Sequence, residues 1–180
     1  MRPEQRLKVA RILAFVVVLA LSILIFTFRD QAQRLAIYGY PGIFLLSFLS
    51  YATVVLPAPG IFVVFTMGGV FNPLLVALSA STGAALGELS GYLAGFSGQA
   101  VVEKAAIYDR LTSWMNRNGT FTVLLLAAIP NPFFDLAGII AGSLRMRLAR
   151  FLIWCWIGET LKMVFFAYSG ANLVNLLPVG

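Results

Sequence analysis

The sequence contains no histidine, a single cysteine and few charged residues. Only 11% of its 180 residues are Asp, Glu, Lys or Arg, whereas soluble domains carry about 25%. The missing histidine excludes histidine acid–base catalysis and histidine metal ligation, and the lone Cys155 excludes an intrachain disulfide. No G-x-x-x-x-G-K-[ST] motif offers a P-loop. These absences predict a protein that is not an enzyme and that uses no metal or other cofactor.

Apolar residues dominate what is present. They make up 60% of the chain, and the mean hydropathy is +0.90, whereas soluble domains are about 45–50% apolar. The sequence therefore predicts an integral membrane protein with the length of one domain. Its net charge of +6 indicates cytoplasmic loops that face anionic lipid headgroups. We expect membrane lipids as partners and no nucleic acid.

A first membrane helix is predicted near the N-terminus. Residues 12–28 carry no charge and follow a basic segment, and at ~1.5 Å per residue they nearly span a ~30 Å hydrocarbon core. A signal peptide is the alternative, but no small-x-small cleavage site follows. We expect a retained helix with a cytoplasmic N-terminus in a bacterial plasma membrane. Residues 29–41 are expected to form a polar connection.

Two later apolar segments, residues 43–71 and 121–144, are each interrupted by a Pro-x-Pro motif that cannot continue a regular helix. The arms of the first segment, 14 and 11 residues long, would reach only ~21 and ~17 Å as helices. A full span needs ~30 Å, so both segments are predicted to be re-entrant hairpins. The residues expected at their tips are Pro57, Pro59, Gly60, Pro130 and Pro132.

Each broken segment is followed by a helix long enough to cross the membrane, at residues 74–96 and 151–173. Small residues recur at every fourth position of the first of these helices, which leaves one face flat for close approach by another helix. That face could pack within the chain or against a second copy, so a homo-oligomer stays open. The glycines expected there are Gly83, Gly87, Gly91 and Gly95.

The two halves of the chain share one order of motifs. In each half, a Pro-x-Pro motif is followed after nine residues by a glycine, and then by Gly-Glu in the crossing helix. We predict an all-α fold in one membrane domain, with residues 39–96 and 120–173 as two inverted repeats. Residues 97–119 are predicted to be an amphipathic cytoplasmic connector that ends at Asn118-Gly119.

The basic residues favour hairpins over full crossings. If each broken segment returns to its own side, ten Lys and Arg residues face the cytoplasm, and only Arg29 and Arg34 lie outside. If both segments crossed fully, three basic residues of the connector would move outside, and the split would worsen to seven against five. The ten are Arg2, Arg6, Lys8, Arg11, Lys104, Arg110, Arg117, Arg145, Arg147 and Arg150.

Ionisable residues inside membrane segments are costly unless they are paired, hydrated or protonated. Glu88 and Glu159 lie in the middle of the two crossing helices, and Asp135 follows the second proline motif. We interpret them as binding sites for substrate or protons. Structural roles are the alternative: Lys162, three residues after Glu159, is a ready ion-pair partner, and Asp135 suits a helix start. Asn131 adds an amide with two donors and one acceptor at a predicted tip.

Arg145 and Arg147 follow the second hairpin in a basic cluster. Arginine binds phosphate through paired hydrogen bonds, so both are candidate contacts to a lipid headgroup. Anchoring at the membrane surface explains them equally well.

Several of these motifs together resemble the DedA superfamily, whose shared region is also called the VTT or SNARE-associated Golgi protein-like domain. The resemblance covers residues 39–173 and implies two facing re-entrant hairpins in a lipid transporter or scramblase. Bacterial members are linked to recycling of undecaprenyl phosphate or flipping of phosphatidylethanolamine with dependence on the proton gradient, and eukaryotic relatives scramble phospholipids. The motifs that carry it are Pro57-x-Pro59, Gly87-Glu88-x-x-Gly91-Tyr92-x-x-Gly95, Gly119, Pro130-x-Pro132-x-x-Asp135, Gly142 and the helix with Gly158.

The chain departs from the better-studied DedA pattern at two places. Gly60 and Ile61 stand where an acidic residue usually follows the first proline motif, and Ala127 and Ala128 stand where an arginine often precedes the second. These departures bring the chain closer to the divergent TVP-type branch. They leave proton coupling and an undecaprenyl phosphate substrate open.

The sequence thus predicts a transporter or scramblase that moves a phospholipid or polyprenyl phosphate headgroup between leaflets through the facing hairpins. A secondary transporter of ions or small solutes could be built on the same inverted repeat. A non-transporting scaffold that shapes the bilayer is a further alternative. An enzyme is the weakest interpretation, because the sequence offers no recognisable nucleophile–base arrangement.

Overall fold

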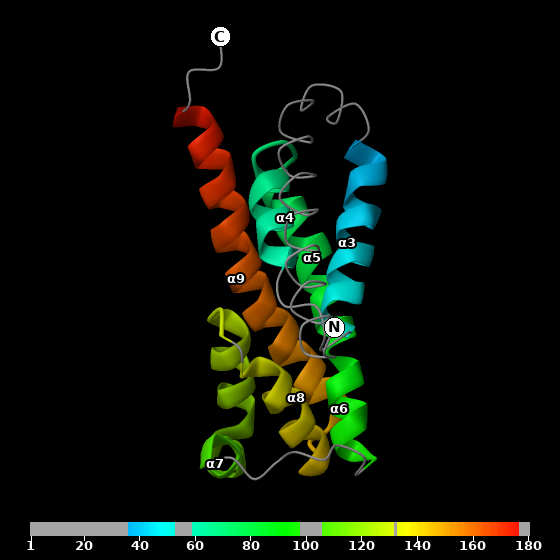
Figure 1. Ribbon diagram of the computed structural model, residues 1–180, viewed down its shortest axis with the longest axis vertical. Helices are drawn as coiled ribbons and strands as arrows, with labels where there is room; N and C mark the ends of the chain where they lie inside the picture. The colour runs from blue at the N-terminus through cyan, green and yellow to red at the C-terminus, as the bar shows by residue number, and fades with distance from the viewer. Residues whose placement is uncertain (1–35, 53–58, 98–105, 132, 177–180) are drawn as a thin grey trace, which may run out of the picture.

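The computed structural model describes residues 36–52, 59–97, 106–131 and 133–176, in which every regular element is an α-helix (Figure 1). This confirms the all-α fold class. The predicted helix at residues 12–28, and the tip residues Pro57 and Pro132, lie outside the described residues. The helices are α3 (Ala36–Ala52), α4 (Pro59–Gly68), α5 (Pro73–Gly87), α6 (Leu89–Phe96), α7 (Ala106–Ala128), α8 (Phe134–Ser143) and α9 (Leu148–Leu176).

Two long helical stretches run the length of the molecule (Figure 1). One is α9, and the other is α5 continued by α6. The backbone at Glu88 between them remains in the right-handed helical region, and the Glu88 N–H donates to the Ala84 carbonyl at 3.0 Å. Within the described residues, Pro73–Phe96 and Leu148–Val174 are the two stretches long and apolar enough to cross a membrane. They correspond to the two predicted crossing helices.

Two shorter helix pairs flank opposite ends of these long helices (Figure 1). We call α3 with α4 the first hairpin, and the last part of α7 with α8 the second hairpin. Helices α4 and α8 have 10 residues each, which gives ~15 Å, about half of a ~30 Å hydrocarbon core. One boundary prediction was wrong: residues 36–41, expected in a polar connection, belong to α3 although Pro41 lies inside it. As the sixth residue of α3, Pro41 removes one helical N–H donor, and the helix continues through it.

A second boundary prediction concerns Asn118, and the structure has a break in the helix at that residue. The residues Asn118-Gly119 were expected to end the connector helix, and the helical backbone is interrupted there: Asn118 is non-helical (φ −147°, ψ 60°), so α7 consists of two helices that meet at a kink. The apolar run that follows resumes the helix at once. Before the kink, α7 is amphipathic: Leu111 and Met115 are buried, whereas Arg110 and Trp114 are exposed.

The start of α5 shows how the local sequence sets a helix boundary. The Asn72 side-chain oxygen accepts hydrogen bonds from the N–H groups of Leu74 and Leu75 at 3.0 and 3.3 Å. Pro73 occupies the first helical position, where its missing N–H removes no helical hydrogen bond. Asn72 therefore caps the helix that carries the glycine face.

The hairpins contact both long stretches in a reciprocal pattern. Helix α3 packs on α5 and α7 packs on α9, so the first helix of each hairpin lies on the long stretch that follows it. Helix α4 packs on α9 and α8 packs on α6, so the second helix of each hairpin lies on the long stretch of the other half. Neither half of the chain is therefore packed on its own.

The glycine face packs within the chain. A Cβ atom on Gly87 would lie 2.7 Å from the Phe48 carbonyl oxygen of α3, and one on Gly83 would overlap the same helix. A Cβ atom on Gly95 would overlap the Ile139 carbonyl of α8, whereas Gly91 leaves ordinary contact distances. The glycines thus serve two interfaces, α5 with α3 and α6 with α8.

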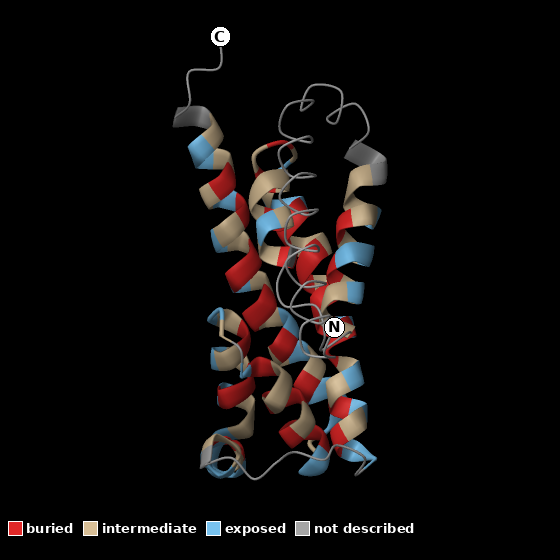
Figure 2. Cartoon of the chain, viewed as in Figure 1, coloured by how far each residue is buried: buried red, intermediate tan, exposed pale blue. Residues whose placement is uncertain are grey.

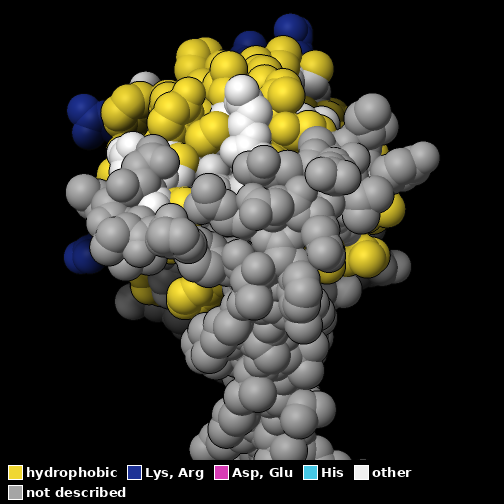
Figure 3. Space-filling view, turned by 90° about the horizontal axis from the view of Figure 1, so that it is seen from above, with side chains coloured by type: hydrophobic (Ala, Val, Ile, Leu, Met, Phe, Trp, Pro, Cys, Tyr) yellow, Lys and Arg dark blue, Asp and Glu magenta, His cyan; other side chains and the backbone are white. Residues whose placement is uncertain are grey.

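The outer surface is apolar. In Figure 2 the buried residues line the inner faces of the helices and the exposed residues lie outside, yet large hydrophobic side chains are common among the exposed ones: Phe121 is 60% and Phe165 67% exposed. Seen end-on in Figure 3, the described side chains are mostly hydrophobic, with Lys and Arg at the rim. Such a surface suits lipid rather than water.

Candidate functional site

A buried cluster of charged residues lies in the middle of the two long helical stretches. Glu88, between α5 and α6, is 2% exposed, and Glu159 of α9 is fully buried. Lys162 is also buried, and its Nζ lies 2.7 Å from Glu159 Oε1, which is the predicted pairing across one helical turn. Glu88 and Asp135 lie within electrostatic range of the same lysine. Four of the predicted site residues are therefore neighbours.

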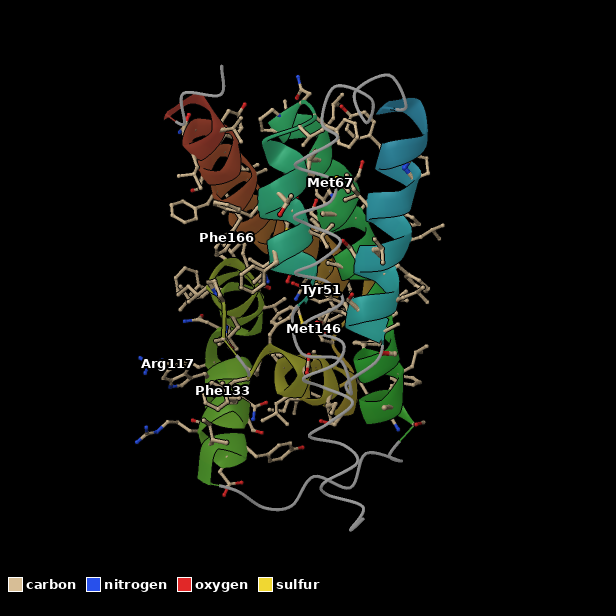
Figure 4. All side chains as sticks on the ribbon, turned by 45° about the horizontal axis from the view of Figure 1, so that its top comes forward. Tyr51, Met67, Arg117, Phe133, Met146 and Phe166 are labelled. Carbon is tan, nitrogen blue, oxygen red and sulfur yellow. The ribbon has the colours of Figure 1, made fainter. Side chains whose placement is uncertain are left out.

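Both hairpins reach this cluster near their tips. Tyr51, from the last turn of α3, places its ring 5.4 Å from Lys162 Nζ, and Phe134, from the first turn of α8, places its ring 5.9 Å away. These are cation–π distances. The Tyr51 hydroxyl also faces the Glu159 carboxylate, and Figure 4 shows Tyr51 at the centre of the molecule. Sequence reasoning missed both rings, and the only signal was their position beside the proline motifs.

The cluster contains carboxylate oxygens without a protein partner. Glu88 Oε1 and Glu159 Oε2 are buried and accept no hydrogen bond from the described residues. The other Glu88 oxygen lies against α8, 3.4 Å from where a Cβ on Gly138 would stand. A buried polar atom without a partner costs about 1–3 kcal/mol. A proton, or a donor group on a ligand, would be stabilised at these atoms.

The two other candidates at the second tip play different parts. Asp135 lies half-buried in the first turn of α8. The Asn131 amide nitrogen donates to the carbonyls of Leu126 and Ile129 at 2.8 and 2.7 Å, and its oxygen accepts from the Phe133 N–H at 2.9 Å. These bonds use both donors and the acceptor to close the tip. The Asn131 side chain therefore stabilises the turn of the second hairpin.

The remaining tip residues lie at helix boundaries. Pro59 and Gly60 begin α4 and Gly60 is buried, whereas Pro130 is exposed in the turn after α7. Pro59 takes the first position of its helix, which suits a residue without an N–H group.

Arg145 and Arg147 lie exposed in the turn between α8 and α9, away from the buried cluster. Arg145 has a left-handed backbone (φ 52°). Its N–H donates to the Gly142 carbonyl at 2.9 Å, and the Met146 N–H donates to the Ala141 carbonyl at 3.0 Å. This bond pattern is a Schellman motif, in which glycine is the usual residue at the position of Arg145.

The turn is also tied to α6, because the Tyr92 hydroxyl donates to the Met146 carbonyl. Within the described residues, no group of three or more Asp, Glu, His or Cys side chains is arranged to hold a metal ion.

Comparison with known proteins gives two kinds of match. The VTT domain matches residues 56–172, about two thirds of the chain. Vacuole membrane protein KMS2 of Arabidopsis thaliana is 33% identical over 98 residues, which cover 44% of this chain and 24% of the plant protein. Vacuole membrane protein KMS1 of the same plant is 33% identical over 84 residues, covering 47% and 20%. The chain thus spans a quarter or less of these relatives, and no solved structure matches it.

Proposed function

The chain belongs to the VTT-domain family of membrane proteins, and on that premise we propose that it moves a phospholipid or polyprenyl phosphate between the two leaflets of a membrane. The proposed role is transport, not catalysis. The end of the molecule that holds α7 and the α8–α9 turn would face the cytoplasm, in keeping with its arginines.

The packing of the helices supports re-entrant hairpins in an inverted repeat. Helices of 10 residues, such as α4 and α8, are too short to cross a hydrocarbon core. The two hairpins flank opposite ends of the long stretches, and the second helix of each hairpin packs on the long stretch of the other half. Transporters built on inverted repeats place their sites where such broken elements meet at the midplane.

The observation that carries the proposal is the buried cluster of Glu88, Glu159 and Lys162 between the hairpin tips. A lipid headgroup that crosses a bilayer loses its hydration, and the resulting energy barrier keeps each lipid in its own leaflet. Lys162 offers a cation to a phosphate, and the unpartnered oxygen of Glu88 offers an acceptor to a protonated amine or hydroxyl. These groups would replace part of the lost hydration.

Lipid translocation in proteoliposomes tests this proposal. The full chain is reconstituted with fluorescent phospholipids or a fluorescent polyprenyl phosphate, and the fraction accessible to an external quencher is followed with and without a pH gradient. We expect translocation by the wild type and a loss of at least tenfold in Glu88→Gln, which keeps the side-chain shape. Gly42→Ala is the matched control, because a Cβ there meets nothing within 4 Å.

The outcomes separate the candidates. Movement without a gradient defines a scramblase, and gradient-driven accumulation defines a coupled transporter. Normal translocation by Glu88→Gln would mean that translocation does not depend on the carboxylate of the buried cluster. No lipid movement by folded wild type would overturn the proposal in favour of solute transport or bilayer shaping.

A further inference from the structure

A cavity of about 540 Å³ opens at the α7 end of the molecule, and none of its lining residues belongs to the buried charged cluster. It lies between the kink of α7 and the turn that joins α8 to α9. Its size is within the ~300–1,000 Å³ that small-molecule sites usually have. Its lining includes Met115, Arg117, Ala141, Met146, Arg150 and Trp154.

Local structure fixes both walls of this cavity. On one side, the non-helical backbone of Asn118 bends α7, and a Cβ added to Gly119 would meet only the Met146 sulfur, at 4.0 Å. On the other side, the Met146 carbonyl accepts a hydrogen bond from the Tyr92 hydroxyl and the Met146 N–H donates to the Ala141 carbonyl, so both backbone polar groups of Met146 are held. The cavity is therefore built into the fold.

The lining is basic at its open side and apolar at its floor. Arg117 of α7 and Arg150 of α9 are exposed, and Figure 4 shows Arg117 extending away from the bundle. Met115 and Ala141 are buried at the floor. None of the lining residues is acidic. Two guanidinium groups favour an anionic ligand, and the apolar floor favours a hydrocarbon chain. Together they favour a ligand that has both parts.

We propose that this cavity binds the phosphate of an anionic lipid at the membrane surface, with Arg117 and Arg150 as the phosphate ligands and the apolar floor against the first part of the acyl chain. Guanidinium groups on two different helices can hold a phosphate monoester from two sides. Delivery of lipid to the central cluster rests on the proposed function, whereas binding in the cavity does not.

Trp154 lines the cavity and supplies a built-in probe. In a Trp114→Phe/Trp156→Phe background, Trp154 fluorescence is titrated with dioctanoyl phosphatidic acid, dioctanoyl phosphatidylcholine or inorganic phosphate below the micelle-forming range of the lipids. We expect saturable binding of phosphatidic acid, at least tenfold weaker binding of phosphatidylcholine, and no comparable response to inorganic phosphate. Far-ultraviolet circular dichroism confirms that each variant is folded.

Arginine variants identify the ligands. Arg117→Gln and Arg150→Gln should each raise the Kd for phosphatidic acid by about tenfold, which is ~1.4 kcal/mol. Arg110→Gln is the control, because it removes the same charge from an exposed position on α7 outside the cavity and should leave the Kd unchanged. An equal effect of Arg110→Gln would reduce the result to general surface charge and overturn the proposal.

The other outcomes are also decisive. Equal affinity for phosphatidylcholine would mean that the arginines do not recognise the phosphate monoester, and equal affinity for inorganic phosphate would mean a free-anion site; either result overturns the lipid assignment. If phosphatidic acid binds as expected while proteoliposomes show no lipid movement, the proposed function fails and the cavity assignment stands.

Discussion

Replacing Gly95 with alanine should separate α6 from α8. A Cβ atom at this position would lie 2.7 Å from the carbonyl carbon and 2.9 Å from the Cα of Ile139 and would overlap the Ile139 oxygen. Non-bonded carbons rest about 3.5–4.0 Å apart, so the helices must move by about 1 Å. All the blocking atoms belong to the backbone of α8 and cannot turn aside. Overpacking of this kind costs about 1–3 kcal/mol.

Gly91→Ala supplies the matched control on the same helix. A Cβ at Gly91 meets the Asp135 carbonyl oxygen at 3.6 Å and Ile139 at 4.0 Å, which are ordinary contacts. Alanine is also favoured over glycine within a helix by about 1 kcal/mol. Gly91→Ala should therefore be neutral or slightly stabilising. Because the same helix preference applies to Gly95, the two variants should differ by the overpacking cost alone, about 1–3 kcal/mol.

Unfolding of the full chain by sodium dodecyl sulfate in mixed micelles, followed by circular dichroism, measures this difference. The reciprocal glycine provides an internal check, because a Cβ on Gly142 of α8 would overlap the Tyr92 carbonyl of α6. Once one methyl group has separated the helices, a second costs less, so Gly95→Ala/Gly142→Ala should lose less than the sum of the single variants. Equal stabilities for Gly91→Ala and Gly95→Ala would refute the close α6–α8 contact.

The same unfolding measurement tests three further predictions. Lys162→Met should cost about 3–5 kcal/mol, because it leaves the carboxylate of Glu159 buried without its cation; Lys162→Met/Glu159→Gln should recover most of the loss, and an unaffected single variant would contradict the pairing. Asn72→Ala should cost about 1 kcal/mol through the lost cap of α5, and Asn72→Ser should keep most of the stability. Arg145→Gly should raise the free energy of unfolding by up to about 1 kcal/mol, because glycine adopts the left-handed backbone without strain; a destabilised variant would show that the arginine side chain itself holds the turn.

Local patterns in the sequence predicted the long helices and one ion pair. The apolar runs set the two crossing stretches, and the spacing of Glu159 and Lys162 across one helical turn was sufficient to pair them. The glycine repeat indicated a close helix contact, although its partner was ambiguous. Such features depend on neighbours within one helix, where the periodicity is known in advance.

Contacts between distant segments could not be predicted in the same way. Tyr51 and Phe134 lie beside Lys162 because two hairpins meet there, and no sequence spacing encodes that meeting. The cavity depends on the kink at Asn118, where the sequence predicted the helix end but not the direction of the helix that follows. Both features concern how helices are joined and packed, which is decided by tertiary contacts and not by propensity.

The packing of each half on the other also determines when each helix can find its partner during biosynthesis. Helix α4 is translated early, yet the surface that it packs on belongs to α9 near the end of the described chain. Until α9 has been made and inserted, α4 lacks its main partner and α7 lacks the long helix beneath it. The two halves therefore cannot complete their packing one after the other, and a ribosome that stalls before residue 148 would leave one helix of each hairpin, α4 and α7, without α9 to pack on. Neither half of such a chain would be fully packed. We therefore expect membrane quality control to degrade the whole chain and not one half of it.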